Sequence, residues 1–201
     1  AAQTGSSAPV PGGGSVSALT GALAAALAEM VANLTAGKEK YACVDAEMRE
    51  LAQSAARIRE ELIGGIKKDS ESFGGYMRAL KLPKETEEEK AERREALQQG
   101  LKEATQAPLA IARTAAEIFP LAQAAVERGN SGAVSDGLIS AMLARTAVLG
   151  ALLNVKINLN SIRDEACAGE LKKEVARLEQ AAAEGEARIL AMSELSASFV
   201  K

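Results

Sequence analysis

The sequence contains no histidine and no tryptophan, and aromatic residues account for only 2% of its 201 residues. Without histidine the chain lacks the commonest metal ligand of proteins and the commonest general base, so proton transfer must use carboxylates, lysines or water. The scarcity of aromatic residues, beside abundant alanine and leucine, disfavours a β-sandwich or barrel and favours close-packed helices. We therefore predict an all-α protein with no metal site.

Cysteine is also scarce, and the net charge is small. The two cysteines, Cys43 and Cys167, lie far apart without metal-binding spacing, which predicts a reducing, cytoplasmic compartment. With 27 acidic and 24 basic residues the net charge is −3, and the basic residues are scattered, so no nucleic-acid partner is expected. The uncharged run from Gly12 to Ala28 falls short of the ~20 apolar residues that a membrane span requires, so no membrane contact is expected either.

The length and the patterning predict one domain over residues 1–201, built from about five to seven mostly long helices. Apolar periodicity and breakers place the helices at about 15–36, 45–80, 87–128, 136–159 and 161–199. Pro108 and Pro120 are expected to kink or divide the third of these. The expected helix caps are Ser15 or Ser17, Asp45, Thr86 in a capping box with Glu89, and Ser135 or Asp136.

Two of the expected helices lack a solvated face. In the first, alanine and glycine fill the faces that larger apolar residues leave, and the helix at 136–159 is similar. Such helices need more neighbours than one small bundle supplies, so we predict a homodimer formed through these two helices. The large apolar residues of the first helix recur every three or four positions: Val16, Leu19, Leu23, Leu27, Met30 and Leu34.

The second helix carries a carboxylate, Asp69, at a position where its periodicity calls for an apolar residue. Burying a charge without partners costs several kcal/mol, so Asp69 must be paired, protonated or facing a cavity. Because glycine inside a helix costs up to about 1 kcal/mol, four glycines near this one acid suggest that room is kept around Asp69. The alternative is an ion pair with an arginine of a neighbouring helix. These glycines are Gly64, Gly65, Gly74 and Gly75.

A proline- and glycine-rich loop, Pro9-Val10-Pro11-Gly12-Gly13-Gly14-Ser15, runs directly into the first helix. Its glycines allow a ligand to lie against the backbone, and the unpaired N–H groups of a helix start favour anions and carbonyl oxygens. Neither a nucleoside-triphosphate loop nor a dinucleotide fingerprint fits, because no Gly-Lys-Ser/Thr follows and no strand precedes. The loop is thus a candidate binding cradle, the alternative being a tight entry loop with a serine cap.

A second loop, from Asn130 to Asp136, also enters a helix, and that helix carries Asn154 and Asn158 on a stripe of small residues. Each asparagine offers a donor and an acceptor, which suit the amide-like edge of a heterocycle. The alternative is that these asparagines bridge a tight helix–helix contact.

The order and spacing of these motifs resemble the formiminotetrahydrofolate cyclodeaminase / methenyltetrahydrofolate cyclohydrolase family over nearly the whole chain. Each motif is weak alone, whereas the combination is fairly specific. The motifs are the Pro9 to Ser15 loop, Ala32-Asn33-Leu34-Thr35, Gly37-Lys38 with Lys40-Tyr41, Asp69 with Phe73, Leu82-Pro83-Lys84 with Thr86, Gly129-Asn130, Ser135-Asp136, Asn154-Val155 and Ile157-Asn158-Leu159.

The resemblance implies an all-helical homodimer with a folate site in a cleft near the subunit contact, and an activity at the N5–N10 bridge of tetrahydrofolate. Members either close a formimino group to methenyl with loss of ammonia or hydrolyse methenyl to the 10-formyl form, without a metal or redox cofactor. The expected partner is a reduced folate, possibly polyglutamylated, and Asp69 is the implied acid–base group. The implied binding residues are Pro11, Gly12, Gly13, Gly14, Ser15, Asn33, Lys38, Asn130, Ser135, Asp136, Asn154 and Asn158.

A hypothesis from another functional class remains open as well as that of an enzyme. The chain could be a non-catalytic helical dimerisation or scaffold module, in which Asp69 and the asparagines fix helix register as buried polar groups. Binding of a folate would distinguish the two hypotheses. The residues alone do not separate cyclodeaminase from cyclohydrolase, because both reactions need the same pterin contacts and the same carboxylate.

Overall fold

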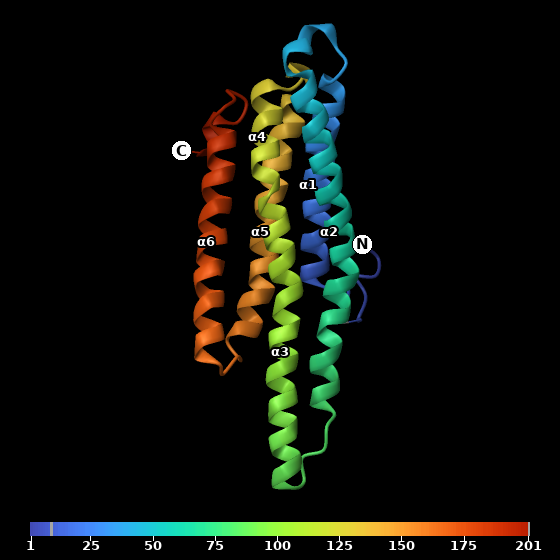
Figure 1. Cartoon of the computed structure of the whole chain (residues 1–201), viewed down its shortest axis with the longest axis vertical. Helices are drawn as coiled ribbons and strands as arrows, with labels where there is room; N and C mark the ends of the chain where they lie inside the picture. Colours follow the sequence, from blue (N-terminus) through green and yellow to red (C-terminus); the bar gives the residue numbers. More distant parts are fainter. Residues whose placement is uncertain (9, 201) are drawn as a thin grey trace.

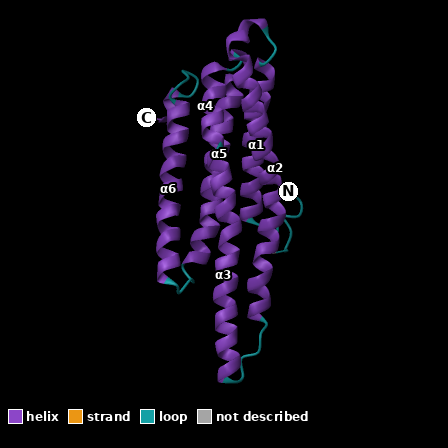
Figure 2. Ribbon diagram, viewed as in Figure 1, coloured by secondary structure: helices purple, strands orange, loops and turns teal. Residues whose placement is uncertain are grey.

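The computed structural model describes residues 1–8 and 10–200, without the side chains of Phe73, Ala197 and Val200. Within these residues there is no strand, which confirms the all-α prediction (Figure 2). The α-helices are α1 Gly13–Thr35, α2 Asp45–Leu80, α3 Glu87–Ala116, α4 Ile118–Arg128, α5 Val134–Leu159 and α6 Glu165–Leu190, with short 3₁₀ helices at Glu39–Val44, Ser131–Ala133 and Ala197–Val200. The helices form an elongated bundle in which the lower ends of the second and third long helices, α2 and α3, extend beyond the others (Figure 1).

The core of the bundle is built around α1 and α5, which run antiparallel and approach each other closely. Ser140 Oγ donates a hydrogen bond of 2.7 Å to the carbonyl of Ala24 across this contact. A Cβ at Gly21 would lie 3.0 Å from Leu62 of α2 and 3.3 Å from Ala147 of α5, so only glycine fits there without displacement. Small side chains thus set the distance between α1 and its neighbours.

Because the small residues of α1 face the core, its large apolar residues point away from it. Val16 and Leu19 are each 42% exposed and Leu23 is 52% exposed, whereas Ala18 and Ala25 are fully buried. The same division occurs on α5, where Leu153 is 62% exposed. The expectation that these helices lack a polar solvated face is confirmed.

Two expected caps at the start of the chain are wrong. Helix α1 begins at Gly13, so Ser15 and Ser17 lie inside its first turns, and Gly12 stands at the cap without a side-chain hydrogen bond. Ser17 instead donates to the carbonyl of Gly13 at 2.7 Å. Asp45 is the first residue of α2 rather than its cap, and its carboxylate accepts a 2.6 Å hydrogen bond from the N–H of Gly37.

The third helix starts as predicted. Thr86 and Glu89 form the capping box, with Thr86 Oγ1 accepting from Glu89 N at 3.1 Å and Glu89 Oε2 accepting from Thr86 N at 3.1 Å. Pro108 lies within α3, and the chain leaves helical hydrogen bonding at Glu117, three residues before Pro120. The expected division of this segment is therefore confirmed at its second proline.

The start of α5 and both ends of α6 differ from expectation. Neither Ser135 nor Asp136 is a cap, because a 3₁₀ turn capped by Asn130 Oδ1 leads into α5 at Val134.

Helix α6 is shorter than 161–199, since Asp164 caps its start. After its end at Leu190, the hydroxyl of Ser196 donates to the carbonyl of Leu190 at 2.7 Å and so satisfies a terminal acceptor.

By length and composition alone, three helical segments of the described chain are apolar enough to cross a membrane: Gly13–Thr35, Glu87–Arg128 and Ser131–Leu159. The uncharged run ends before Glu29, whose carboxylate pairs with Arg59 of α2 at 2.8 Å, and α1 itself continues to Thr35. Between 50% and 56% of each apolar window is buried inside the bundle.

Candidate functional site

A cavity of about 240 Å³ opens where α1 begins, between the glycine loop, α2, α3 and α5. The start of α1 brings the loop against the middle of α2, and the antiparallel α5 brings its C-terminal half to the same place. The cavity therefore unites segments from four parts of the chain. Its lining residues are Val10, Gly12, Gly13, Gly14, Asp69, Ser72, Ala104, Pro108, Asn154, Ile157 and Asn158.

Asp69 is the only charged residue among the described residues that line this cavity. Its Oδ2 accepts a 2.8 Å hydrogen bond from the hydroxyl of Ser15, which is itself only 3% exposed and also lies 3.1 Å from Ser70 Oγ. Among the described residues no lysine or arginine forms an ion pair with Asp69. The described residues therefore do not form the alternative, an ion pair between Asp69 and an arginine of a neighbouring helix.

Two opposing effects act on the pKa of Asp69. Partial burial raises the pKa, because desolvation disfavours the carboxylate. The hydroxyl and the backbone N–H of Ser15 lower it by donating hydrogen bonds to the charged form, and burial has the larger effect. The side chain thus occupies the N-terminal end of α1, where the helix dipole also favours a negative charge. The result is a partly buried carboxylic acid whose pKa lies above its ordinary value.

Gly14 makes room for this carboxylate. A Cβ at Gly14 would lie 2.1 Å from Asp69 Oδ1, so any other residue would displace the acid. The glycines of α2 do not have this role: a Cβ at Gly64 would meet nothing within 4 Å, and one at Gly65 would contact Ile111. The expectation that the α2 glycines keep room around Asp69 is wrong, because the space is provided by the facing helix.

Asn154 and Asn158 lie on α5 and line the cavity. Asn154 Nδ2 donates to the carbonyl of Gly150 at 2.9 Å, and Asn158 Nδ2 donates to the carbonyl of Ala104 at 3.2 Å. These bonds fix both amides and leave their side-chain oxygens without a hydrogen bond among the described residues. An amide oxygen in this position can accept from the N–H groups of a ligand.

The structure brings together only part of the predicted site. Pro11, Gly12, Gly13, Gly14, Ser15, Asp69, Asn154 and Asn158 gather at the start of α1. Pro9 lies outside the described residues, and so does the side chain of Phe73. Five further residues line the cavity but were not predicted as binding residues: Val10, Ser72, Ala104, Pro108 and Ile157. Val10 and Ile157 lie within motifs of the resemblance, whereas no motif distinguished the other three from packing residues.

The remaining predicted residues gather at the opposite end of α1. Asn130 N donates to Thr35 Oγ1 at 2.8 Å, and its side-chain amide donates to the carbonyl of Leu34 at 3.2 Å. Because α1 has 23 residues, this end lies about 33 Å from Gly13 at 1.5 Å per residue. We call the residues here the distal cluster: Asn33, Lys38, Lys40, Tyr41, Asn130, Ser131, Ser135 and Asp136.

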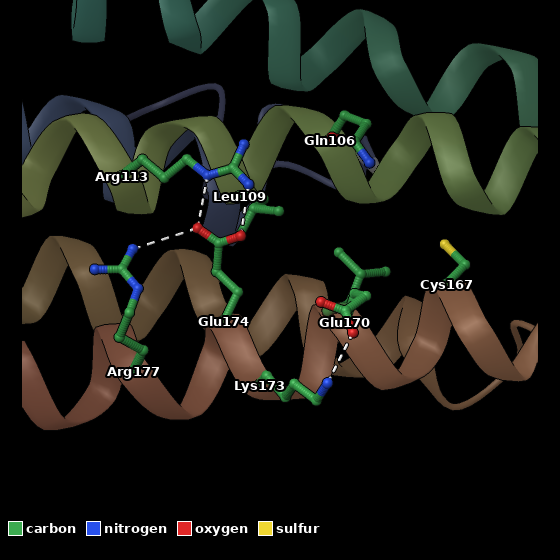
Figure 3. Close-up of a pocket in the computed structure, with 9 residues that line it drawn as sticks. Gln106, Leu109, Arg113, Cys167, Glu170, Lys173, Glu174 and Arg177 are labelled. Atoms are coloured by element: carbon green, nitrogen blue, oxygen red, sulfur yellow. Dashed lines mark hydrogen bonds and ion pairs between the residues drawn. The ribbon is translucent and has the colours of Figure 1, made fainter.

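A larger hollow of about 450 Å³ lies between α3 and α6, and ion pairs dominate it (Figure 3). Arg113 binds Glu174 through two hydrogen bonds of 2.9 and 2.6 Å, and Arg177 contacts the same carboxylate at 3.4 Å. These charged groups are satisfied by one another and fasten α6 to α3. Within residues 1–8 and 10–200, no group of three or more Cys, Asp or Glu side chains is placed to hold a metal ion.

Comparisons with known proteins point to one family. A sequence profile of the formiminotransferase-cyclodeaminase family matches residues 1–177. Methenyltetrahydrofolate cyclohydrolase of Methylorubrum extorquens is 42% identical over 170 residues, covering 85% of this chain and 82% of that protein. Formimidoyltransferase-cyclodeaminase of Sus scrofa is 38% identical over 90% of this chain, which spans about a third (33%) of that longer protein. The crystal structure of formiminotetrahydrofolate cyclodeaminase from Thermotoga maritima superposes with a TM-score of 0.85 at 32% identity, covering 99% of this chain and 94% of that one.

Proposed function

Because this chain belongs to the formiminotransferase-cyclodeaminase family, we propose that it is a folate enzyme acting at the N5–N10 bridge of tetrahydrofolate. The first candidate reaction is the hydrolysis of 5,10-methenyltetrahydrofolate to 10-formyltetrahydrofolate, which consumes water and releases a proton. It is supported by the relative of that name, which matches most of both chains. The second candidate is the closure of 5-formiminotetrahydrofolate to the methenyl form with loss of ammonia, supported by the solved structure of that name.

The observation that carries this proposal is the placement of Asp69 in the cavity at the start of α1. Both reactions pass through a tetrahedral carbon between two nitrogens, so protons must be moved at the attacking and leaving groups. A carboxyl whose pKa is raised by burial takes up a proton more readily than an ordinary aspartate, which suits it to receive and return these protons. Ser15 fixes the orientation of the carboxyl through its 2.8 Å hydrogen bond.

The asparagines have a binding role in this proposal. The free side-chain oxygens of Asn154 and Asn158 accept hydrogen bonds from the amino and ring N–H groups of the pterin. The glycine loop supports the ring from the opposite side, since residues 12–14 present only backbone to the cavity. The proposed chemistry needs no metal or redox cofactor, and the free, separated cysteines suit a cytoplasmic protein.

Steady-state assays with both folates test the proposed function. We expect turnover of 5,10-methenyltetrahydrofolate, followed by loss of its chromophore, and we expect reduced folates to raise the melting temperature by mass action. Turnover of 5-formiminotetrahydrofolate with ammonia release, and none of the methenyl compound, would assign the second reaction. A protein that neither converts nor binds either folate would be the scaffold module and would overturn the proposal.

We also propose that the chain forms a homodimer through one face of α1 and α5. Nine large apolar side chains on these helices are each 39–69% exposed. Together they expose on the order of 800 Å², about what each partner contributes to an interface of standard size. We call this surface the apolar face: Val16, Leu19, Leu23, Met30, Leu34, Ile139, Met142, Leu153 and Ile157.

The dimer predicts a specific effect of a charge in the apolar face. Leu23 lies at the middle of α1 and is 52% exposed, so a Leu23→Arg variant keeps the fold of the chain but buries an unpaired charge in the dimer. We expect sedimentation equilibrium to give a dimer for the wild type and a monomer for Leu23→Arg at micromolar concentration. Ile63→Arg is the control, because Ile63 is 44% exposed on α2 and should leave the dimer intact. A monomeric wild type would contradict the proposal.

A further inference from the structure

Pro108 interrupts the hydrogen bonding of α3 at the wall of the Asp69 cavity. It is buried inside this 30-residue helix, about two turns before the helix ends at Ala116. Proline is the least favourable residue in a helix interior, because it has no N–H to donate and its ring displaces the carbonyl four residues earlier. A proline in the first turn of a helix has no such effect, but Pro108 is far from the start at Glu87. Pro108 therefore changes the hydrogen bonding of the residues around it.

The carbonyl that lacks its helical donor because of Pro108 is that of Ala104. In a regular helix the N–H of residue 108 donates to the carbonyl of residue 104. Ala104 is only 4% exposed, and a buried carbonyl without a donor destabilises the fold. The donor comes from α5 instead, since Asn158 Nδ2 lies 3.2 Å from the oxygen of Ala104. A side-chain amide of α5 thus replaces the N–H that α3 lacks.

This hydrogen bond determines which way the amide of Asn158 points. A carbonyl oxygen can only accept, so the NH₂ group of Asn158 must face Ala104 and Oδ1 must lie on the other branch of the amide. Asn158 lines the cavity together with Ala104 and Pro108. Its Oδ1 has no hydrogen bond among the described residues and is not one of their buried atoms without a partner, so a ligand can reach it. Asn158 therefore offers an acceptor to the cavity, and not a donor.

The second amide of the cavity is held in a different way. Asn154 Nδ2 donates at 2.9 Å to the carbonyl of Gly150, which belongs to the same helix, α5. Its orientation does not depend on α3. Of the two amides, only that of Asn158 is therefore coupled to Pro108.

We propose that Pro108 is a positioning residue of the folate site. It frees the carbonyl of Ala104, and this carbonyl holds the amide of Asn158 with its oxygen available to the ligand. The inference rests on the proposed folate activity, in which this oxygen accepts from the amino and ring N–H groups of the pterin. An amide that is fixed before binding need not be ordered by the ligand, so the fixed orientation strengthens binding and selects a ligand edge that carries donors.

The Pro108→Ala variant tests this role, because alanine restores the N–H of residue 108 and removes the ring that displaces the carbonyl. Ala104 then pairs within α3 and releases Asn158. We expect the melting temperature to rise by about 5 °C, since alanine suits a helix interior better than proline. The Kd for tetrahydrofolate, measured by calorimetric titration, should nevertheless rise about tenfold, the effect of one well-placed hydrogen bond. With 5,10-methenyltetrahydrofolate the loss should fall on KM and leave kcat within about twofold.

Pro120→Ala is the matched control. Pro120 is the third residue of α4 and is exposed, and the N–H groups in the first turn of a helix have no helical acceptor. Replacing this proline should therefore change neither the Kd for tetrahydrofolate nor the hydrogen bonding of α4.

A double-mutant cycle shows whether Pro108 acts through Asn158. In an Asn158→Ala background we expect Pro108→Ala to change the Kd for tetrahydrofolate less than about twofold, because the amide that it releases is already gone. In an Asn154→Ala background the tenfold effect should persist. The same cycle in melting temperature needs no ligand: Asn158→Ala should lower it in the wild type, where Ala104 loses its donor, and lower it less in Pro108→Ala.

Three results would overturn the role of Pro108 while the proposed function survives, provided that the wild type binds and converts a folate. These are an unchanged Kd in Pro108→Ala, a lower melting temperature in Pro108→Ala, and effects on Kd that add in the cycle with Asn158→Ala. A wild type that neither binds nor converts a folate would overturn the proposed function and the ligand contact of Asn158 together.

Discussion

We expect the Asp69→Asn variant to lose about two to four orders of magnitude in kcat, the range that a general acid–base group supplies. Asparagine keeps the size and polarity of the side chain and can still accept the hydrogen bond from Ser15, which is 2.8 Å long in the wild type. It cannot take up or release the proton. Substrate affinity should therefore change little, so that the loss falls on kcat rather than KM.

The stability of the Asp69→Asn variant should not fall with its rate. Burial raises the pKa of Asp69 in the folded state above its ordinary value of 3.8, so the stability contributed by the protonated acid is fully present below the unfolded pKa. That contribution is lost as the pH rises through the raised folded pKa. At neutral pH the Asn variant should thus melt at the same temperature as the wild type or higher, and this advantage should disappear below pH 3.8.

Rate and melting temperature must be measured on the same preparation. Turnover within threefold of wild type would make Asp69 a packing residue. A strongly reduced melting temperature with normal turnover per folded molecule would lead to the same conclusion. In the wild type, the rate of methenyl hydrolysis should also fall with decreasing pH at an apparent pKa above 3.8, as the carboxylate becomes protonated.

The second large effect is expected from Gly14→Ala. The new methyl carbon would lie 2.1 Å from Asp69 Oδ1 and 2.6 Å from its carboxyl carbon, so the carboxyl must move by an ångström or more. A displacement of this size at a reacting group costs about 100-fold in rate, because catalysis depends on the alignment of the proton carrier. We expect kcat to fall by about that factor while the helical circular dichroism stays unchanged.

Two alanine variants serve as controls for Gly14→Ala. A Cβ at Gly64 meets nothing within 4 Å, so Gly64→Ala should leave turnover unchanged and stabilise α2 slightly. A Cβ at Gly13 lies 3.4 Å from Asn154 Nδ2, an ordinary contact, so Gly13→Ala should affect binding more than rate. Equal turnover in Gly14→Ala and Gly64→Ala would show that the position of Asp69 is not constrained by α1.

Local patterns predicted the helices well and their caps less well. The bounds of α2 and the Thr86–Glu89 capping box follow from residues that lie next to each other in sequence. The caps at Ser15 and Asp45 were predicted from the same kind of local rule, but their side chains bond to Asp69 and to Gly37 instead. Contacts between distant segments override a local preference of about 1 kcal/mol.

Prediction of the site from local patterns is limited in the same way. Asp69 could be singled out because a carboxylate in an apolar stripe is anomalous by periodicity alone. Gly14 as the residue that admits this carboxylate could not, since the glycines of α2 are nearer to it in sequence. Ser72 and Pro108 belong to helices whose faces are assigned only when α2 and α3 are packed.

The sequence by itself determined the all-α class and the approximate helices, because both follow from composition and from a period of 3.6 residues. Only the tertiary structure decided which residues share a cavity. It set Asp69 at the N-terminal end of α1 and separated the distal cluster from it by the length of that helix. The distance between two residues far apart in sequence depends on how the helices pack, so no local sequence pattern predicts it.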